Sequence, residues 1–395
     1  MKTKTKKTDY LEMLLMIIVT VGPISQVIKI IVCSLLIIMN LLFGGLNQTR
    51  TNHNNKSTLF AIFIICFMAV AMIFDLRNIS SANPYSFASF AYLFPFLVAL
   101  FYIKKYPLYK FGAIYEKVSF FLCVISLIGF ALIVLRPSLF THFPSIYYYE
   151  RKLYTIGIYN AMHDWTDVGM LGRNCGCAYE PGAFQFVLSL GLAFVYLNKK
   201  SFSKRSFVVR IIFYSLGILS TMSTTGIVIL GLLFIFNSVK DKKTFFATIV
   251  VVAILGALII SSYKYQLSKM DTGNFESRFG NTRYVITNYW NNFLGVGSTG
   301  YNSIYASNEK IGSWDLYSNL FLRFGYPFLI LFLFGVIRTR KISFSIMLVL
   351  LLTFLTEPLV GPITVCLIYY GIDLNNQAIK KRSLSNESVV GLQCS

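Results

Sequence analysis

Long apolar stretches, separated by short polar or basic segments, run along most of the chain. Segments 59–74, 86–103 and 118–135 are almost free of charged residues, and each approaches the roughly 20 residues that a helix needs to cross a bilayer. The pattern therefore predicts helices of membrane-spanning type. We predict twelve, with ten or eleven as the alternative count, over residues 10–22, 25–45, 59–75, 86–103, 117–136, 181–198, 206–220, 224–237, 244–262, 315–337, 342–356 and 358–373.

The composition of the chain is strongly apolar. Hydrophobic residues make up 55% of the 395 residues, charged residues make up only 13%, and the mean hydropathy is +0.63. A soluble core could not bury so much apolar surface. We therefore predict an all-α polytopic integral membrane protein in which residues 1–395 form a single transmembrane domain.

The formal net charge of +20 would suggest nucleic-acid binding in a soluble protein. Here the positions of the basic residues explain it, because seven segments that we assign to the cytoplasm hold 24 Lys and Arg against 6 Asp and Glu. The remaining loops hold 10 against 10. This asymmetry follows the positive-inside rule, and it predicts two cytoplasmic termini and no nucleic-acid partner. The seven segments are 1–12, 50–56, 104–117, 199–210, 240–243, 338–341 and 373–395.

Three apolar runs lie between two cytoplasmic segments and must therefore cross the membrane twice. We predict that they turn at Gly22-Pro23, at 220–225 and at 356–358, where turn-forming or helix-stopping residues occur. The basic N-terminal stretch is not followed by a cleavage site of small residues, so we expect it to remain as a cytoplasmic tail.

Two longer polar segments, 137–180 and 263–314, are predicted to face outward. Both are rich in Tyr, Trp, Asn and Arg, a mixture that can hydrogen-bond sugar hydroxyls and stack on sugar rings. Long ordered loops in a compact architecture usually carry function. The alternative for their aromatic residues is an ordinary belt at the membrane interface.

Several polar residues at the edges of these segments are candidates for chemistry. Arg173 lies seven residues before Glu180, which stands at the start of a span, where an acidic residue suits a helix cap as well as catalysis. Asp315, Asn319 and Arg323 recur at intervals of four and share one helix face. An arginine inside a span is a functional candidate, and the alternative is that its side chain extends to the outer interface.

A series of short motifs follows in order between residues 173 and 337. The first runs from Arg173 through Glu180-Pro181 to the aromatic residue Phe184, and the second is Ser-Thr-Met-Ser-Thr-Thr-Gly at 220–226. The next two are Arg278 to Arg283 and Leu-Gly-Val-Gly at 294–297, and the last is the pair of segments 317–320 and 323–327. In order, spacing and sidedness they resemble the O-antigen polymerase and ligase superfamily of bacterial envelope glycosyltransferases. One departure is Thr224, which stands where that family's Ser-Arg-Thr-Gly turn has arginine.

The resemblance implies a GT-C-like, metal-independent membrane glycosyltransferase of the bacterial plasma membrane that needs no cofactor. It would join undecaprenyl-pyrophosphate-linked oligosaccharide repeats into O-antigen, capsule or exopolysaccharide at the outer face, with a chain-length regulator and a flippase as partners. Guanidinium groups suit the anionic diphosphate that departs, and Glu180 is favoured as the base, before Asp315 and Glu357. We expect catalysis at Arg173, Glu180 and Arg283, and substrate binding at Arg278, Arg323, Asp315 and Asn319.

Three other functions stay open. An O-antigen ligase usually carries a histidine in the late external loop, but His53, His142 and His163 lie elsewhere, which favours a polymerase. A transporter, or a flippase of lipid-linked oligosaccharide, would place its polar site near the middle of the membrane, whereas here polar residues concentrate in the two external segments. A sensor or assembly scaffold would tolerate alanine at Arg173 or Arg283.

Overall fold

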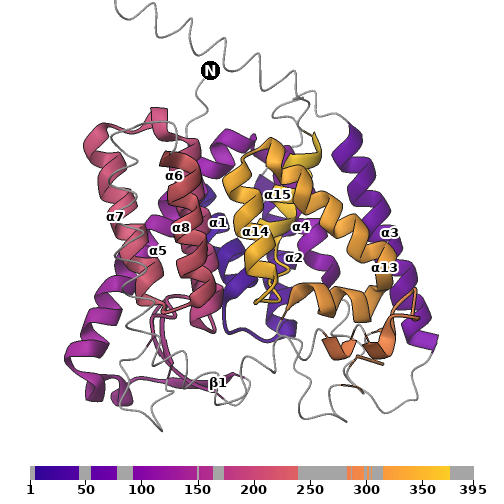
Figure 1. Cartoon of the computed structure of the whole chain (residues 1–395), viewed down its shortest axis with the longest axis horizontal. Coiled ribbons are helices and arrows are strands. Elements are labelled where there is room, and N and C mark those ends of the chain that lie inside the picture. The colour runs from indigo at the N-terminus through magenta and orange to yellow at the C-terminus, as the bar shows by residue number, and fades with distance from the viewer. Residues whose placement is uncertain are drawn as a thin grey trace, which may run out of the picture.

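The computed structural model describes residues 5–43, 55–77, 92–148, 151–162, 173–238, 283–285, 287–297, 300–301, 304 and 315–373. Within these residues the chain is mostly helical (Figure 1). The described helices are α1 (Lys7–Val21), α2 (Gln26–Phe43), α3 (Asn55–Arg77), α4 (Leu93–Lys105), α5 (Leu108–Leu135), α6 (Pro181–Leu197), α7 (Lys204–Ser220), α8 (Thr224–Ser238), α13 (Leu316–Arg338), α14 (Phe344–Phe354) and α15 (Pro362–Asp373). The 3-10 helices are η2 (Pro137–His142), η3 (Lys199–Ser201) and η4 (Thr339–Lys341).

The predicted spans agree well with these helices. Eleven of the twelve coincide with a described helix, and span 244–262 lies outside the described residues. The three predicted turns are confirmed as helix breaks, between α1 and α2, between α7 and α8, and between α14 and α15. The largest difference is α5, which begins at Leu108 directly after Pro107, because proline favours the start of a helix and the charged residues that follow are compatible with one.

Membrane association is supported by the length and surface of the helices. By length and composition alone, two described stretches could cross a membrane, Leu108–Leu135 and Leu316–Lys341, and six shorter helices are also apolar. Large apolar side chains are exposed on the outside of the bundle, such as Val27 at 66% and Leu42 at 70% in α2. A water-facing helix would seldom expose so many.

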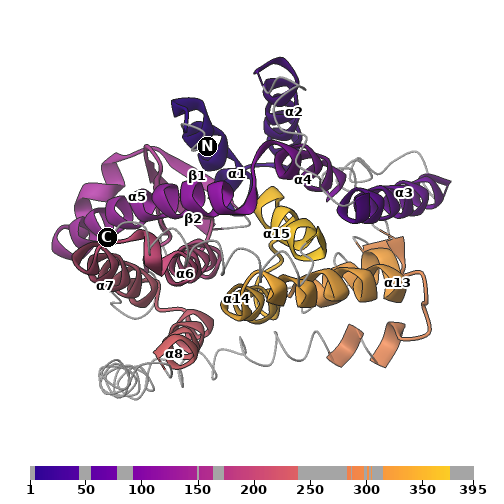
Figure 2. The same cartoon turned by 90° about the horizontal axis from the view of Figure 1, so that it is seen from above.

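Helix α6 lies in the interior of the bundle. Its residues from Pro181 to Val195 are all buried, and it packs against α5, α7, α8 and α14, as seen from above in Figure 2. Gly191 allows the close approach, because a Cβ there would lie 2.7 Å from the Tyr214 ring of α7. Helix α15 is similarly enclosed, packing on α4, α13 and α3.

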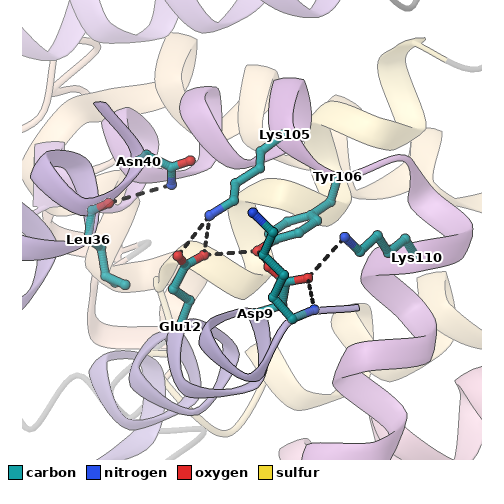
Figure 3. Close-up of polar contacts among 8 residues, drawn as sticks. Asp9, Glu12, Leu36, Asn40, Lys105, Tyr106 and Lys110 are labelled. Carbon is teal, nitrogen blue, oxygen red and sulfur yellow. Dashed lines mark hydrogen bonds and ion pairs between the residues drawn. The ribbon is translucent and has the colours of Figure 1, made fainter. Parts of the chain in front are cut away.

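The basic segments that the structure describes gather at one end of the bundle, the top in Figure 1. There the N-terminal part of α1 is tied to the connection between α4 and α5 by the polar cluster in Figure 3. Lys105 Nζ lies 2.7 Å from the Glu12 carboxylate, and Lys110 Nζ lies 2.9 Å from Asp9. The Tyr106 hydroxyl lies 2.8 Å from Asp9 Oδ1 and 2.9 Å from Glu12 Oε2, so its proton is shared between two acceptors.

Two further contacts bring other basic segments to the same end. Arg210 Nε donates to Glu116 Oε1 at 2.6 Å, which joins α7 to α5. The Tyr370 hydroxyl donates to the Tyr106 carbonyl at 2.6 Å, and the neighbouring Gly371 lies against the backbone of Arg338. Within the described residues, segments that were assigned to one side from charge alone therefore lie together in space.

The opposite end carries an element that was not predicted, a three-stranded antiparallel sheet of β1 (Ser145–Tyr148), β2 (Arg151–Ile156) and β3 (Tyr159–Met162). The chain is therefore mostly helical rather than all-α. Tyrosine and β-branched residues favour these strands, and Gly157, with φ of +60°, begins the two-residue turn between β2 and β3. The Tyr159 ring packs against Gly129 of α5, which fixes the sheet to the bundle.

Candidate functional site

Most of the predicted site residues lie at the end of the bundle that carries the sheet. Arg173 and Glu180 flank the segment that leads into α6, and Asp315, Asn319 and Arg323 lie in the first turns of α13. Arg278 lies outside the described residues. The candidate site is therefore built from the start of α6, the turn between α7 and α8, and the start of α13.

Arg173 is bound to the turn between α7 and α8. Its Nε donates to the Thr221 carbonyl at 3.0 Å and its Nη2 donates to the Met222 carbonyl at 3.3 Å. Met222 has φ of +48°, a conformation that non-glycine residues seldom adopt. The last carbonyls of a helix have no hydrogen-bond donor within the helix. At the end of α7 the Arg173 guanidinium supplies the donors, from a segment 48 residues away in the sequence.

Asn174 holds the same segment in place. Its backbone N–H donates to the Ser220 carbonyl at 3.1 Å, and its Nδ2 donates to the Ser220 and Ser126 hydroxyls at 2.8 and 3.2 Å. Its Oδ1 accepts the Gly176 N–H at 3.0 Å. Asn174 is fully buried, and the four bonds satisfy its polar groups. Arg173 is therefore attached to a rigid segment rather than to a free loop.

Two acidic residues lie at the start of α6. Glu180 occupies the N-cap position and is 7% exposed, but its side chain makes no capping hydrogen bond, so a structural cap does not account for it. Glu357, between α14 and α15, is 3% exposed. A Cβ placed on Gly182 would overlap its carboxylate, so Glu357 lies directly on the first turn of α6. Both carboxylates thus lie at the N-terminal end of α6.

Arg323 is enclosed by polar and aromatic groups. Its Nε donates to Asn319 Oδ1 at 2.9 Å, and the Tyr92 hydroxyl donates to the same oxygen at 3.4 Å. The guanidinium carbon lies 3.9 Å from the centre of the Tyr301 ring and 5.1 Å from that of Tyr92, within the range of cation–π attraction. Arg323 is 8% exposed, so the side chain is buried rather than extended to the interface.

Asp315 has a different role from its predicted partners. Its Oδ1 accepts the Ser318 N–H at 2.7 Å, so it caps the N-terminus of α13. The spacing of four residues predicted that Asn319 and Arg323 share one helix face, and in the structure the two side chains are hydrogen-bonded. Asp315 precedes the same helix, and its side chain binds the helix backbone.

Residues 293–296 are attached to α13 at a kink. Gly325 has φ of +76° and interrupts the helix. Here Val296 N–H donates to the Leu322 carbonyl at 2.6 Å and Tyr326 N–H donates to the Phe293 carbonyl at 3.0 Å. Gly295 also has a positive φ, and the two glycine backbones pack against each other. Only residues without a Cβ allow this close approach.

Arg283 is not part of either group. Its side chain is exposed, and no hydrogen bond or ring contact joins it to Arg173 among the described residues. The structure thus brings Arg173 to the turn 220–226 and Arg323 to Asn319, whereas no side-chain hydrogen bond or ring contact joins Arg283 to either pair in the part of the chain that the structure describes.

Two cavities in the described part of the chain are relevant to the site. One, of about 280 Å³, is an apolar groove between α1 and α5 at the basic end. The other, of about 50 Å³, lies between α2, α4 and the connection from α14 to α15, and its lining includes Lys29, Gln26 and Tyr92. Neither cavity is lined by Arg173, Glu180 or Arg283.

Sequence reasoning did not select three residues of this region, namely Lys29, Tyr92 and Tyr301. For Lys29 a signal was present, because it is a charged residue within an apolar segment. The two tyrosines carried none, since tyrosine is common at the ends of membrane helices.

Comparison of the chain with protein-family models, with curated proteins and with solved structures finds no match. The functional conclusion therefore depends on the residues and geometry described above.

Proposed function

We propose that this chain is a multi-pass protein of the bacterial plasma membrane that polymerises lipid-pyrophosphate-linked oligosaccharide repeats into a surface polysaccharide. One observation carries the proposal: Arg173 of the first motif binds the carbonyls of Thr221 and Met222 in the second. Two motifs that were selected separately for their resemblance to the polymerase superfamily are thus parts of one structure.

The contact between Arg173 and this turn also explains why Thr224 can stand where the superfamily motif has arginine. This residue is exposed at the first position of α8, where the motif of the superfamily has arginine. The Arg173 guanidinium lies against the same turn, so a cation is present there although the turn itself contributes none. We infer that Arg173 supplies the positive charge at this position.

Arg173 has donors left for a substrate. A guanidinium carries five N–H donors, and two are used by the Thr221 and Met222 carbonyls in the described structure. The remaining three can bind the oxygens of a diphosphate, and arginine stays charged at any physiological pH. A cation held by a rigid segment is preorganised for the charge that develops on the leaving group.

The reaction needs one proton acceptor. The acceptor hydroxyl oxygen would bond to the anomeric carbon of the donor sugar, while the bond from that carbon to the diphosphate breaks and its electron pair leaves with the diphosphate. The hydroxyl proton would pass to a carboxylate, for which Glu180 and Glu357 at the start of α6 are the candidates. Asp315 is less suitable, because its carboxylate caps α13.

The proposed orientation places both termini in the cytoplasm and the sheet end outside. It is supported by the clustering of the basic segments at one end of the bundle (Figure 1), because basic residues concentrate on the cytoplasmic side of membrane proteins. Lipid-pyrophosphate-linked repeats are then met on the opposite face, where Arg173 lies.

The test compares Arg173→Ala, Arg173→Lys and Arg136→Ala in cells that lack the chromosomal copy. Arg136 is an exposed arginine at the same end of the bundle, after α5, so Arg136→Ala controls for loss of charge. Removal of one preorganised donor slows a reaction roughly 100-fold or more. We expect Arg173→Ala to leave single repeat units on a glycan gel, and Arg136→Ala to give the normal ladder.

Arg173→Lys is expected to behave like Arg173→Ala, since an ammonium cannot bind two carbonyls and a diphosphate in one fixed geometry. Membrane abundance of each variant should be measured beside the glycan. A normal ladder from Arg173→Ala at normal abundance would contradict the proposed role and favour a sensor or scaffold.

A further inference from the structure

Lys29 lines a small cavity near the start of α2. It is the fourth residue of that helix and is partly buried, and the cavity of about 50 Å³ is also lined by Gln26, Tyr92 and Pro358. Among the described residues its ammonium makes no hydrogen bond and no ion pair. A cavity of this size holds a few water molecules or one small anionic group.

A cation in such a place requires an explanation. Burying an unpaired ammonium is costly, and an ionisable residue retained within a membrane segment usually has a function. The described structure supplies Lys29 with polar neighbours, Gln26 and Tyr92, but with no carboxylate at ion-pair distance. Among the described residues, therefore, no side chain supplies a negative charge to pair with Lys29.

A second cation lies against Tyr92. The Arg323 guanidinium carbon is 5.1 Å from the centre of the Tyr92 ring, and both residues contact Asn319 Oδ1. Tyr92 thus lines the cavity of Lys29 and also contacts Arg323, and the two cations carry a combined charge of two. Such a pair matches a group with more than one negative charge better than it matches a chloride ion or a single carboxylate.

The position of the cavity indicates where this anion comes from. Next to Lys29 in sequence, Val27 and Ile28 are 66% and 46% exposed on the outside of the bundle, so this face of α2 meets acyl chains. Lys29 lies in the first turn of the helix, from which the long lysine side chain can reach the headgroup region of a bilayer. The anionic groups at that depth are phosphates.

We propose that the cavity at Lys29 binds a phosphate or diphosphate group, with Lys29 as the direct contact and Arg323 as the second positive charge. A bilayer lipid and a free diphosphate are the two possible carriers of this group. The inference does not depend on the proposed polymerase activity, because it follows from the unpaired ammonium and its cavity.

The test measures binding by the purified full-length protein in detergent. The probes are farnesyl diphosphate, farnesol as the same lipid without phosphate, and inorganic diphosphate as the same anion without lipid. The variants are Lys29→Gln, Lys29→Arg, and Lys204→Gln, which changes an exposed lysine at the opposite end of the bundle. Loss of one charged contact weakens binding by roughly tenfold or more.

We expect Lys29→Gln to weaken binding of farnesyl diphosphate at least tenfold, Lys29→Arg to restore most of it, and Lys204→Gln to leave it unchanged. Tight binding of inorganic diphosphate would identify the free anion as a sufficient ligand, whereas binding of farnesyl diphosphate alone would identify the lipid-borne group. Equal affinity of Lys29→Gln and the unchanged protein would overturn the proposal.

A second measurement needs no variant and covers the case in which Lys29→Gln does not fold. The unchanged protein is treated with acetic anhydride, and the acetylation of Lys29 is followed by mass spectrometry. Farnesyl diphosphate, but not farnesol, is expected to protect Lys29 while Lys204 reacts equally in all samples. If Lys29 were acetylated to the same extent with and without farnesyl diphosphate and inorganic diphosphate, the site would not exist.

Discussion

Replacing Glu12 by glutamine is expected to loosen α1 from the connection between α4 and α5. The Glu12 carboxylate is 1% exposed and accepts Lys105 Nζ at 2.7 Å on each oxygen and the Tyr106 hydroxyl at 2.9 Å (Figure 3). Glutamine would offer one acceptor instead of two and would turn its amide N–H groups toward an ammonium. Removing one partner of a buried pair costs about 3–5 kcal/mol. Because the Lys105 side chain is 17% exposed, we expect the lower end, about 3 kcal/mol.

The assay is thermal unfolding of the detergent-purified protein, followed by loss of its monodisperse peak. For a chain of this size 1 kcal/mol corresponds to about 1–2 °C, so Glu12→Gln should melt about 3–6 °C lower. Lys117→Gln is the matched control, because Lys117 is exposed and contacts the Tyr10 hydroxyl at 3.2 Å. Its effect should stay within about 0.5 kcal/mol.

A double-mutant cycle decides whether the pair itself is responsible. Removing Lys105 as well, in Glu12→Gln/Lys105→Gln, takes away the unpaired ammonium and should recover at least about 1 kcal/mol. If Glu12→Gln and Lys117→Gln melted at the same temperature, or if the cycle gave no coupling, the reasoning that this pair fastens α1 would be refuted.

Two further predictions concern the kink in α13 and the acid end of the pH range. Gly325→Ala should lower stability by about 1–3 kcal/mol, because its φ of +76° disfavours a Cβ that would also overlap the Leu294 backbone. Gly231→Ala should not lower stability, because a Cβ there would meet nothing within 4 Å. Equal melting temperatures of Gly325→Ala and Gly231→Ala would contradict the role of the kink. Burial raises the pKa of Asp9, but hydrogen bonds and the charge of Lys110 outweigh it, so the pKa lies below its ordinary value of 3.8. The resulting stabilisation is complete above the ordinary pKa of 3.8 and is lost as the pH falls through the lower pKa of the folded state. The melting temperature of Asp9→Asn should therefore lack this decrease at acid pH. Identical pH profiles of the melting temperature for Asp9→Asn and the unchanged protein would contradict a stabilising contact between Asp9 and Lys110.

Much of the helical architecture could be predicted from the residues alone. Runs of apolar residues located eleven described helices, and the prolines and glycines near 22, 221 and 357 located the breaks between them. The sheet at 145–162 was missed, because its strands are short and rich in tyrosine, which also suits an interfacial belt. The contact between Asn319 and Arg323 was predictable because it is local to one helix.

The assembly of the candidate site was not predictable in the same way. Motif order suggested that Arg173 and the 220–226 turn belong to one site, but only the packing of α5, α6 and α7 brings the guanidinium to the Thr221 carbonyl. Arg283 was expected to act together with Arg173, and the role of Arg283 stays a prediction, since its side chain is exposed and makes no hydrogen bond to Arg173 among the described residues.

The amino-acid sequence by itself determined which segments are helical and which of them share a side of the bundle. Helix length, helix ends and the distribution of basic residues are properties of neighbouring residues, so they can be read along the chain. The tertiary structure decided which polar side chains meet. Tyr92 and Asn319 are 227 residues apart, and Lys29 lines a cavity with the same tyrosine only through the packing of α2 on α4. Contacts of that kind depend on how helices pack in three dimensions, which no local pattern specifies.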